Sequence, residues 1–121
     1  MRYACLIYCD PKRAFDGSVE SNAILSQVGP FEATLKERGV FVMGLPLTLP
    51  NEAMTITVRD GKTSVTDGPF METKEVLGGL VLLEASDLNE AVQLASGMPF
   101  AKLGAIEVRP LVDFSKPRPR L

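Results

Sequence analysis

RYACLIY, residues 2–8, is an almost entirely apolar run, and after Cys9 it is followed by the strand-breaking pair Asp10-Pro11. In an extended chain, successive side chains point to opposite faces of the sheet. The run therefore divides into two apolar sets, Tyr3, Cys5 and Ile7 on one face and Ala4, Leu6 and Tyr8 on the other. A strand that is apolar on both faces is typical of the centre of a sheet with a cover on each side.

The remaining elements are indicated by the periodicity of apolar residues. A helical pattern over residues 18–38 is interrupted at Gly29-Pro30, which predicts either a kinked helix or a second helix that begins with Pro30 in its first turn. A second helix is expected after Asp87, which has the chemistry of an N-cap. The predicted strands cover residues 40–44, 54–59, 62–66, 77–84 and 105–111.

This order of elements predicts an α+β fold. Without the hairpin at residues 54–66 it is βαββαβ, the ferredoxin-like arrangement, in which both helices cover one face of the sheet. The other face is then bare, although the first strand is apolar on that side too. We therefore expect a homodimer in which two sheets face each other as a dimeric α+β barrel. Residues 1–112 are expected to form one domain and residues 113–121 a basic, Pro-rich tail that frays.

Composition limits the function. The 121 residues carry a net charge of −2, so nucleic acid is not an expected partner. No run is long enough for a membrane span, and no signal peptide is evident, so we expect a cytoplasmic location. The absence of histidine removes the commonest general base and, with only two cysteines, makes a metal site unexpected. No cofactor is indicated, and Cys5 is interpreted as a small core residue.

Asp67 is the candidate site residue that follows from the hairpin. Asp60-Gly61 is the strongest short hairpin signal, and the register that it sets places Asp67 opposite Met54 on the apolar face of the hairpin. A carboxylate at the edge of buried surface needs hydrogen bonds or a cation, or its pKa rises. A purely structural role is the alternative, in which Asp67 accepts backbone N–H bonds in the turn.

The segment after Asp67 concentrates polar side chains. Phe70 is expected to anchor the loop in the core, and Glu72, Lys74 and Glu75 follow as one polar turn. Gly78-Gly79 then permits a β-bulge or the close approach of another backbone or a ligand. The cluster is compatible with proton transfer or with holding a polar ligand, and equally with a solvated turn.

Three stretches carry a family resemblance: DGPFMETKEVLGG at residues 67–79, GAIEVRPL at residues 104–111 and the N-terminal YACLIY strand. Together they resemble the YCII-related, or DGPF-domain, family over residues 1–111. The resemblance implies a dimeric α+β barrel. Related proteins in the wider superfamily include small lyases and dehydrochlorinases with a His-Asp pair. Here Met98-Pro99 stands where many relatives have His-Pro, so only Asp67 can be carried over.

Two functions are compatible with these residues. In the first, a lyase- or isomerase-like site binds a small molecule. Its expected members are Asp67 as general base or polar anchor, Glu72 and Glu75 as its partners, Lys74 or Arg109 for an anionic group, Tyr8 as a donor, and Gly78 and Gly79. In the second, the chain is a non-catalytic regulatory module, associated through its family with an extracytoplasmic-function sigma factor. The motif would then be a structural clasp, with Glu107 paired to Arg109 or Lys74. Whether the protein is an enzyme stays open.

Overall fold

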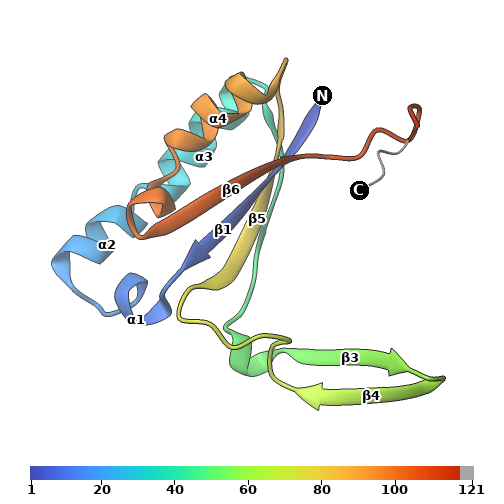
Figure 1. The fold of residues 1–121 in the computed structure, drawn as a ribbon. Coiled ribbons are helices and arrows are strands. Elements are labelled where there is room, and N and C mark those ends of the chain that lie inside the picture. Colours follow the sequence, from blue (N-terminus) through green and yellow to red (C-terminus); the bar gives the residue numbers. More distant parts are fainter. Residues whose placement is uncertain (118–121) are drawn as a thin grey trace.

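The structure, a computed structural model, describes residues 1–117 and consists of six strands and four α-helices (Figure 1). The strands are β1 Arg2–Cys9, β2 Phe41–Pro46, β3 Met54–Arg59, β4 Lys62–Asp67, β5 Val76–Glu84 and β6 Gly104–Pro110. The helices are α1 Pro11–Ala14, α2 Val19–Leu25, α3 Val28–Glu37 and α4 Leu88–Ser96, with short 3-10 turns η1 Pro50–Glu52 and η2 Pro99–Lys102. Residues 118–121 of the predicted tail lie outside the described part.

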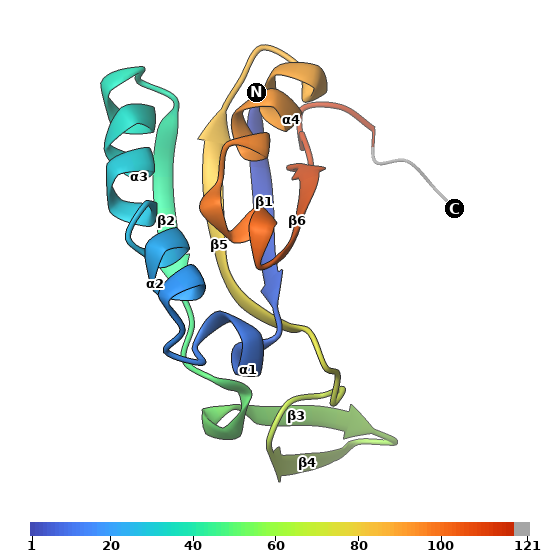
Figure 2. The same cartoon turned by 90° about the vertical axis from the view of Figure 1, so that its left-hand side faces the viewer.

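Four of the strands form an antiparallel sheet in the order β2-β5-β1-β6, and the helices cover one of its faces (Figure 2). This is the predicted ferredoxin-like arrangement, with β1 in the interior of the sheet as its apolar sequence indicated. The helix-facing core contains Tyr3 and Cys5 of β1, Leu83 of β5 and Leu35 of α3, all of them buried. The fold class predicted from the sequence is therefore confirmed.

The helical region between β1 and β2 differs from the expectation in where it breaks. Two helices are present, but α2 ends at Leu25 and α3 begins at Val28, so Pro30 is the third residue of α3. A proline ring clashes with the carbonyl group four residues before it, which here belongs to Ser26. The helix must therefore stop at Ser26, a full turn ahead of the proline. Pro30 itself costs no hydrogen bond, because N–H groups in a first turn have no partner inside the helix.

Local signals at other element ends are confirmed. Asp87 caps α4, because its carboxylate accepts a hydrogen bond from the Glu90 N–H at 2.8 Å. Gly39 follows α3 in the left-handed region with φ 71°. Asp60 and Gly61 have φ values of 52° and 75°, and the hairpin pairs Arg59 with Lys62 and Met54 with Asp67, as the register predicted. Both backbone angles are positive, as a two-residue hairpin turn of this type requires.

The hairpin β3–β4 stands apart from the four-stranded sheet and projects on the side away from the helices (Figure 1). Four apolar side chains lie on one of its faces, each more than half exposed: Met54, Ile56, Val58 and Val65. An isolated two-stranded hairpin is at best marginally stable in water. This arm therefore presents an apolar surface that no other element of residues 1–117 covers.

The sheet face opposite the helices, here called the open face, is apolar as well. The strand registers place on it Ala4, Leu6 and Tyr8 of β1, Leu77, Leu80 and Leu82 of β5, and Met43 and Leu45 of β2. The side chains of Met43 and Leu45 are 45% exposed. The predicted bare face is therefore present, and contiguous apolar surface of this kind marks an interaction site.

Candidate functional site

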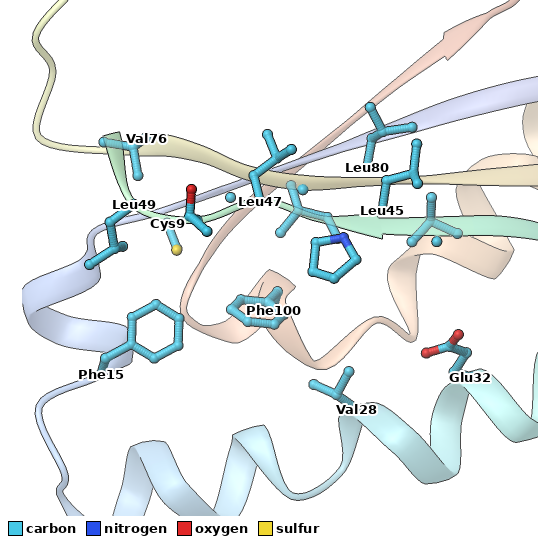
Figure 3. Close-up of a pocket in the computed structure, with 17 residues that line it drawn as sticks. Cys9, Phe15, Val28, Glu32, Leu45, Leu47, Leu49, Val76, Leu80 and Phe100 are labelled. Carbon is cyan, nitrogen blue, oxygen red and sulfur yellow. The ribbon is translucent and has the colours of Figure 1, made fainter. Parts of the chain in front are cut away.

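A pocket of about 490 Å³ lies between the helix layer and the ends of β2 and β5 (Figure 3). Phe15, Phe100 and Val28 lie on its helix side, while Cys9 and Leu49 face them from the sheet side. Pockets of 300–1,000 Å³ lined mainly by apolar side chains are typical of small-molecule sites. The arrangement can therefore enclose an apolar molecule between two aromatic rings and the edge of the sheet.

Glu32 is the one charged side chain among the described residues that line this pocket. It comes from α3, and its carboxylate lies close to β2, where a Cβ atom on Gly44 would be 3.7 Å from Glu32 Oε1. The carboxylate is also 3.6 Å from Lys36 Nζ, and the Glu32 side chain is only partly exposed. The pocket therefore offers one hydrogen-bond acceptor at its margin and an apolar interior.

Gly78 and Gly79, predicted to allow a bulge or a close approach, do both. Ile7 pairs with Gly79 and Tyr8 with Leu77, so Gly78 is the extra residue of a β-bulge. A Cβ atom at Gly79 would lie 2.9 Å from the Leu45 carbonyl oxygen, so the backbone of β2 needs the glycine at this position. Both glycines line the pocket, where they shape its wall.

The two cysteines are free thiols on the helix-facing side of β1. Burial raises the pKa of Cys5 from 9.0 to about 11. Burial, followed by the nearby charges of Asp10 and Glu75, also raises the pKa of Cys9, whose sulfur points into the pocket (Figure 3). Because the thiolate is the reactive form, both side chains act as apolar groups at neutral pH rather than as nucleophiles.

The raised pKa of Cys5 predicts a loss of stability in alkaline solution. The folded state holds the thiol proton above pH 9, whereas the unfolded chain releases it, so the free energy of unfolding should fall between pH 9 and 11 by about 2 kcal/mol. Urea unfolding of the protein and of Cys5→Ala over this range measures the effect. The alanine variant should have a shallower slope, and equal slopes would contradict the assignment.

A second hollow, of about 680 Å³, lies at the base of the hairpin, and Leu47, Leu49 and Val76 line both this hollow and the first pocket. Tyr8 and Leu77 of the open face line it together with Pro69, Phe70 and Glu75 of the motif segment. The fold therefore brings Tyr8 and Glu75, two of the predicted site residues, to one hollow. Gly78 and Gly79 line the other pocket, so these predicted site residues are divided between the two pockets.

Asp67 is where the structure departs most from the sequence-based expectation. The predicted register is present, but the side chain is exposed and lines none of the pockets described above. Within residues 1–117 its carboxylate accepts no hydrogen bond, so the alternative role as a turn cap is not observed either. Half-burial of Asp67 is therefore wrong for the protomer, because the hairpin that carries it packs on no other element. Its role as a site residue stays a prediction.

The other motif residues are also exposed. Phe70, expected in the core, is 72% exposed, because the loop that carries it lies outside the sheet rather than over it. Glu72 and Lys74 are exposed and do not line either pocket. Arg109 lies on the open face and forms an ion pair with Glu107, as one of the two interpretations predicted. Its predicted role in holding an anionic ligand remains a prediction.

Sequence reasoning missed most of the residues that line the pocket between the helix layer and the sheet. Besides residues of β1, β2 and β5, its lining comes from Phe15 just after α1, from α3, from η2 and from the loop after β2, segments that carry no polar motif. One signal was available in the sequence LPLTLP at residues 45–50, where two leucines occupy the loop between Pro46 and Pro50. Apolar side chains in a surface loop require a cover or a ligand, and Leu47 and Leu49 do line the pocket.

Among residues 1–117, no helix is long and apolar enough to cross a membrane.

Comparison with known proteins shows what this chain is similar to. A family model described as the YCII-related domain matches residues 1–115, which include all six strands. An uncharacterised protein from Rhizobium meliloti (strain 1021) is 33% identical over 114 residues, which cover 92% of each chain. A solved structure of 5-chloro-2-hydroxyhydroquinone dehydrochlorinase from Burkholderia phenoliruptrix AC1100, in complex with 2,5-dihydroxybenzoquinone, is 17% identical with a TM-score of 0.48, covering 95% of this chain and 97% of that one.

Proposed function

Because this chain belongs to the YCII-related domain family, we propose that it binds a small apolar molecule with an aromatic ring in the pocket between the helix layer and the sheet. The observation that carries this proposal is the pocket itself, about 490 Å³ in volume and walled by Phe15 and Phe100. Aromatic walls favour a flat ligand ring, because offset and edge-to-face contacts add about 0.5–1.5 kcal/mol to the free energy of burial.

Glu32 supports a narrower ligand class. Its carboxylate accepts hydrogen bonds and repels anions, while the other lining side chains are uncharged. A ligand with a hydroxyl or amine group at one end can donate a hydrogen bond to Glu32 and place its ring in the apolar interior of the pocket. A ligand with a carboxylate in the same place would meet a like charge. We therefore expect a ring that carries a donor, such as a phenol, rather than an aromatic acid.

The test is a titration of the protein with 2-naphthol and 2-naphthoate, followed by NMR chemical-shift changes. We expect 2-naphthol to bind at least about tenfold more tightly, since close like charges near a protein surface cost more than 1 kcal/mol. Val28→Trp, which fills the pocket from α3, should weaken 2-naphthol binding by at least about tenfold. Val19→Trp is the matched control, because Val19 is 88% exposed on α2 and lines none of the described pockets.

Two outcomes decide between the sites. Unchanged affinity in Val28→Trp would show that the ligand does not bind in this pocket. Asp67→Asn tests the acid predicted from the motif, whose carboxylate lies outside the pocket. If this variant loses binding at an unchanged melting temperature, the acid takes part in the site. Unchanged binding removes Asp67 from it.

We also propose that the protein is a homodimer in which the open faces of two sheets pack together. The support is the open face itself, where leucines of β1 and β5 are partly exposed at the centre of the sheet. The open-face residues of β1, β5 and β2 are mainly apolar, and Glu107 and Arg109 lie on β6 at one edge, so two such faces are self-complementary, as a two-fold interface requires. Burial of this surface would cover the second side of β1, whose sequence is apolar on both faces.

A further inference from the structure

The chain has exposed apolar side chains just after its last strand. Leu111, Val112 and Phe114 are 42%, 49% and 86% exposed, respectively. The Leu111 N–H donates to the Arg2 carbonyl oxygen at 3.0 Å, which ties the start of this segment to the beginning of β1. Beyond that bond the segment, residues 111–116, projects on the side of the sheet away from the helices (Figures 1 and 2). We call it the C-terminal segment.

The hollow at the base of the hairpin is an apolar cavity at the opposite end of the sheet. It lies near the end of β1 where Cys9 pairs with Val76. The C-terminal segment begins at the other end of β1, where Tyr3 pairs with the last residue of β6. Phe70 and Met71 of the wall of the hollow are 72% and 67% exposed. The hairpin and the C-terminal segment lie at opposite ends of the strands and on the same side of the sheet (Figure 1). The hollow at the base of the hairpin is therefore far from the C-terminal segment of its own chain.

A two-fold axis that brings two open faces together must lie in the plane between the sheets. If the axis ran along the strands, both hairpins would project at the same end, into the same space. If it runs across the strands, it exchanges the ends of the sheet, so that each hairpin lies beside the end of its partner from which β6 emerges. The second arrangement avoids the collision and places the C-terminal segment of one chain against the hollow of the other.

On the basis of the homodimer proposed above, we infer that the C-terminal segment of each chain packs into the hairpin-base hollow of a second copy, with Phe114 beside Phe70. The hollow of about 680 Å³ has room for a phenylalanine side chain and its neighbours. The pairing covers two apolar surfaces that are both exposed in the protomer. It also supports the hairpin from its base, which a two-stranded arm requires for stability.

Charge favours the same pairing. The chain around the hollow carries Asp67, Glu72 and Glu75 against Lys74. The residues that continue from Phe114 read SKPRPRL, with three basic residues and no acidic one. Lys116 is exposed, and its Nζ atom is 4.0 Å from an Asp113 carboxylate oxygen. Glu75, the one charged side chain among the described residues that line the hollow, and the basic residues that follow Phe114 attract each other between two copies, which raises specificity for this arrangement.

Phe114→Ala tests the inference through the dimer dissociation constant, measured by sedimentation velocity over a concentration series of the full chain. The substitution removes the buried surface of two phenylalanine side chains per dimer, so the dissociation constant should rise by at least about 100-fold. Val19→Ala is the control, since it truncates an apolar side chain that is 88% exposed on the helix layer. It should leave the constant unchanged.

A disulfide cross-link identifies the contact. Phe114→Cys and Thr73→Cys chains are mixed and oxidised, while the native thiols stay buried. A cross-linked heterodimer is expected, with no such product from either variant alone. If a chain that carries both substitutions forms the disulfide within itself, the C-terminal segment packs into the hollow of its own chain, and the inference is overturned. A dimer with no cross-link and an unchanged constant in Phe114→Ala overturns this inference alone, whereas a chain that stays monomeric overturns the proposed dimer as well.

Discussion

Leu82→Arg is expected to abolish self-association of this protein. Leu82 lies at the centre of the open face, where it pairs with Ala4 of β1 and Met43 of β2. In the proposed dimer this position is buried between two sheets. The interface would therefore contain two new charges, one from each chain. An unpaired buried charge costs several kcal/mol, so the dimer dissociation constant should rise by at least about 1,000-fold.

Sedimentation equilibrium of the two proteins measures this effect. Val19→Arg is the matched control, because it places the same charge on the far side of the molecule at an exposed position of α2. Far-UV circular dichroism shows whether the variant keeps its fold, as we expect for a side chain on the outer face of the sheet. A Leu82→Arg protein that remains dimeric at micromolar concentration would place the interface elsewhere.

Gly79→Ala is expected to destabilise the protein by about 1–3 kcal/mol, while Gly78→Ala changes its stability by less than about 1 kcal/mol. The added Cβ atom at Gly79 would lie 2.9 Å from the Leu45 carbonyl oxygen and 3.2 Å from Pro46 Cα. Both contacts are with backbone, which cannot rotate away, so β2 must move off β5. At Gly78 the nearest atom is Cys9 Sγ at 3.7 Å, an ordinary contact.

Urea unfolding of both variants at one fixed protein concentration tests this difference, since the stability of a dimer depends on concentration. The pair is informative because the two glycines are adjacent in the motif and both line the pocket between the helix layer and the sheet. If the two alanine variants lose the same stability, the bulge rather than the approach of β2 determines the need for glycine. A neutral Gly79→Ala would contradict the packing described here.

Features that depend on a few neighbouring residues could be predicted from the sequence. Asp60-Gly61 defined the hairpin register, because positive φ angles at two successive residues select one type of turn. Asp87 defined the start of α4 through one hydrogen bond to a nearby N–H group. The break between α2 and α3 was misplaced, although it too has a local cause. The clash of Pro30 acts four residues back, at Ser26, and not at the proline itself.

The candidate site could be predicted only in part. Gly78 and Gly79 were correctly assigned to a bulge and a close approach, because glycine inside a strand often marks one or the other. The exposure of Asp67 and Phe70 could not be predicted, since it depends on where the hairpin lies relative to the sheet. The register of the hairpin determines which residues lie opposite each other. It does not determine which element, if any, packs on the face of the hairpin that these residues share.

The sequence by itself determined the order of the elements, the pairing within the hairpin and the two-sided apolar character of β1, since each depends on short-range sterics or on the period of the side chains. Only the tertiary structure decided that Phe15, Phe100 and Glu32 share a pocket, because they lie far apart in the sequence and meet through packing of the helices on the sheet. It also decided that the hairpin projects away from the sheet, because such long-range placement depends on the packing of whole elements and not on the local pattern.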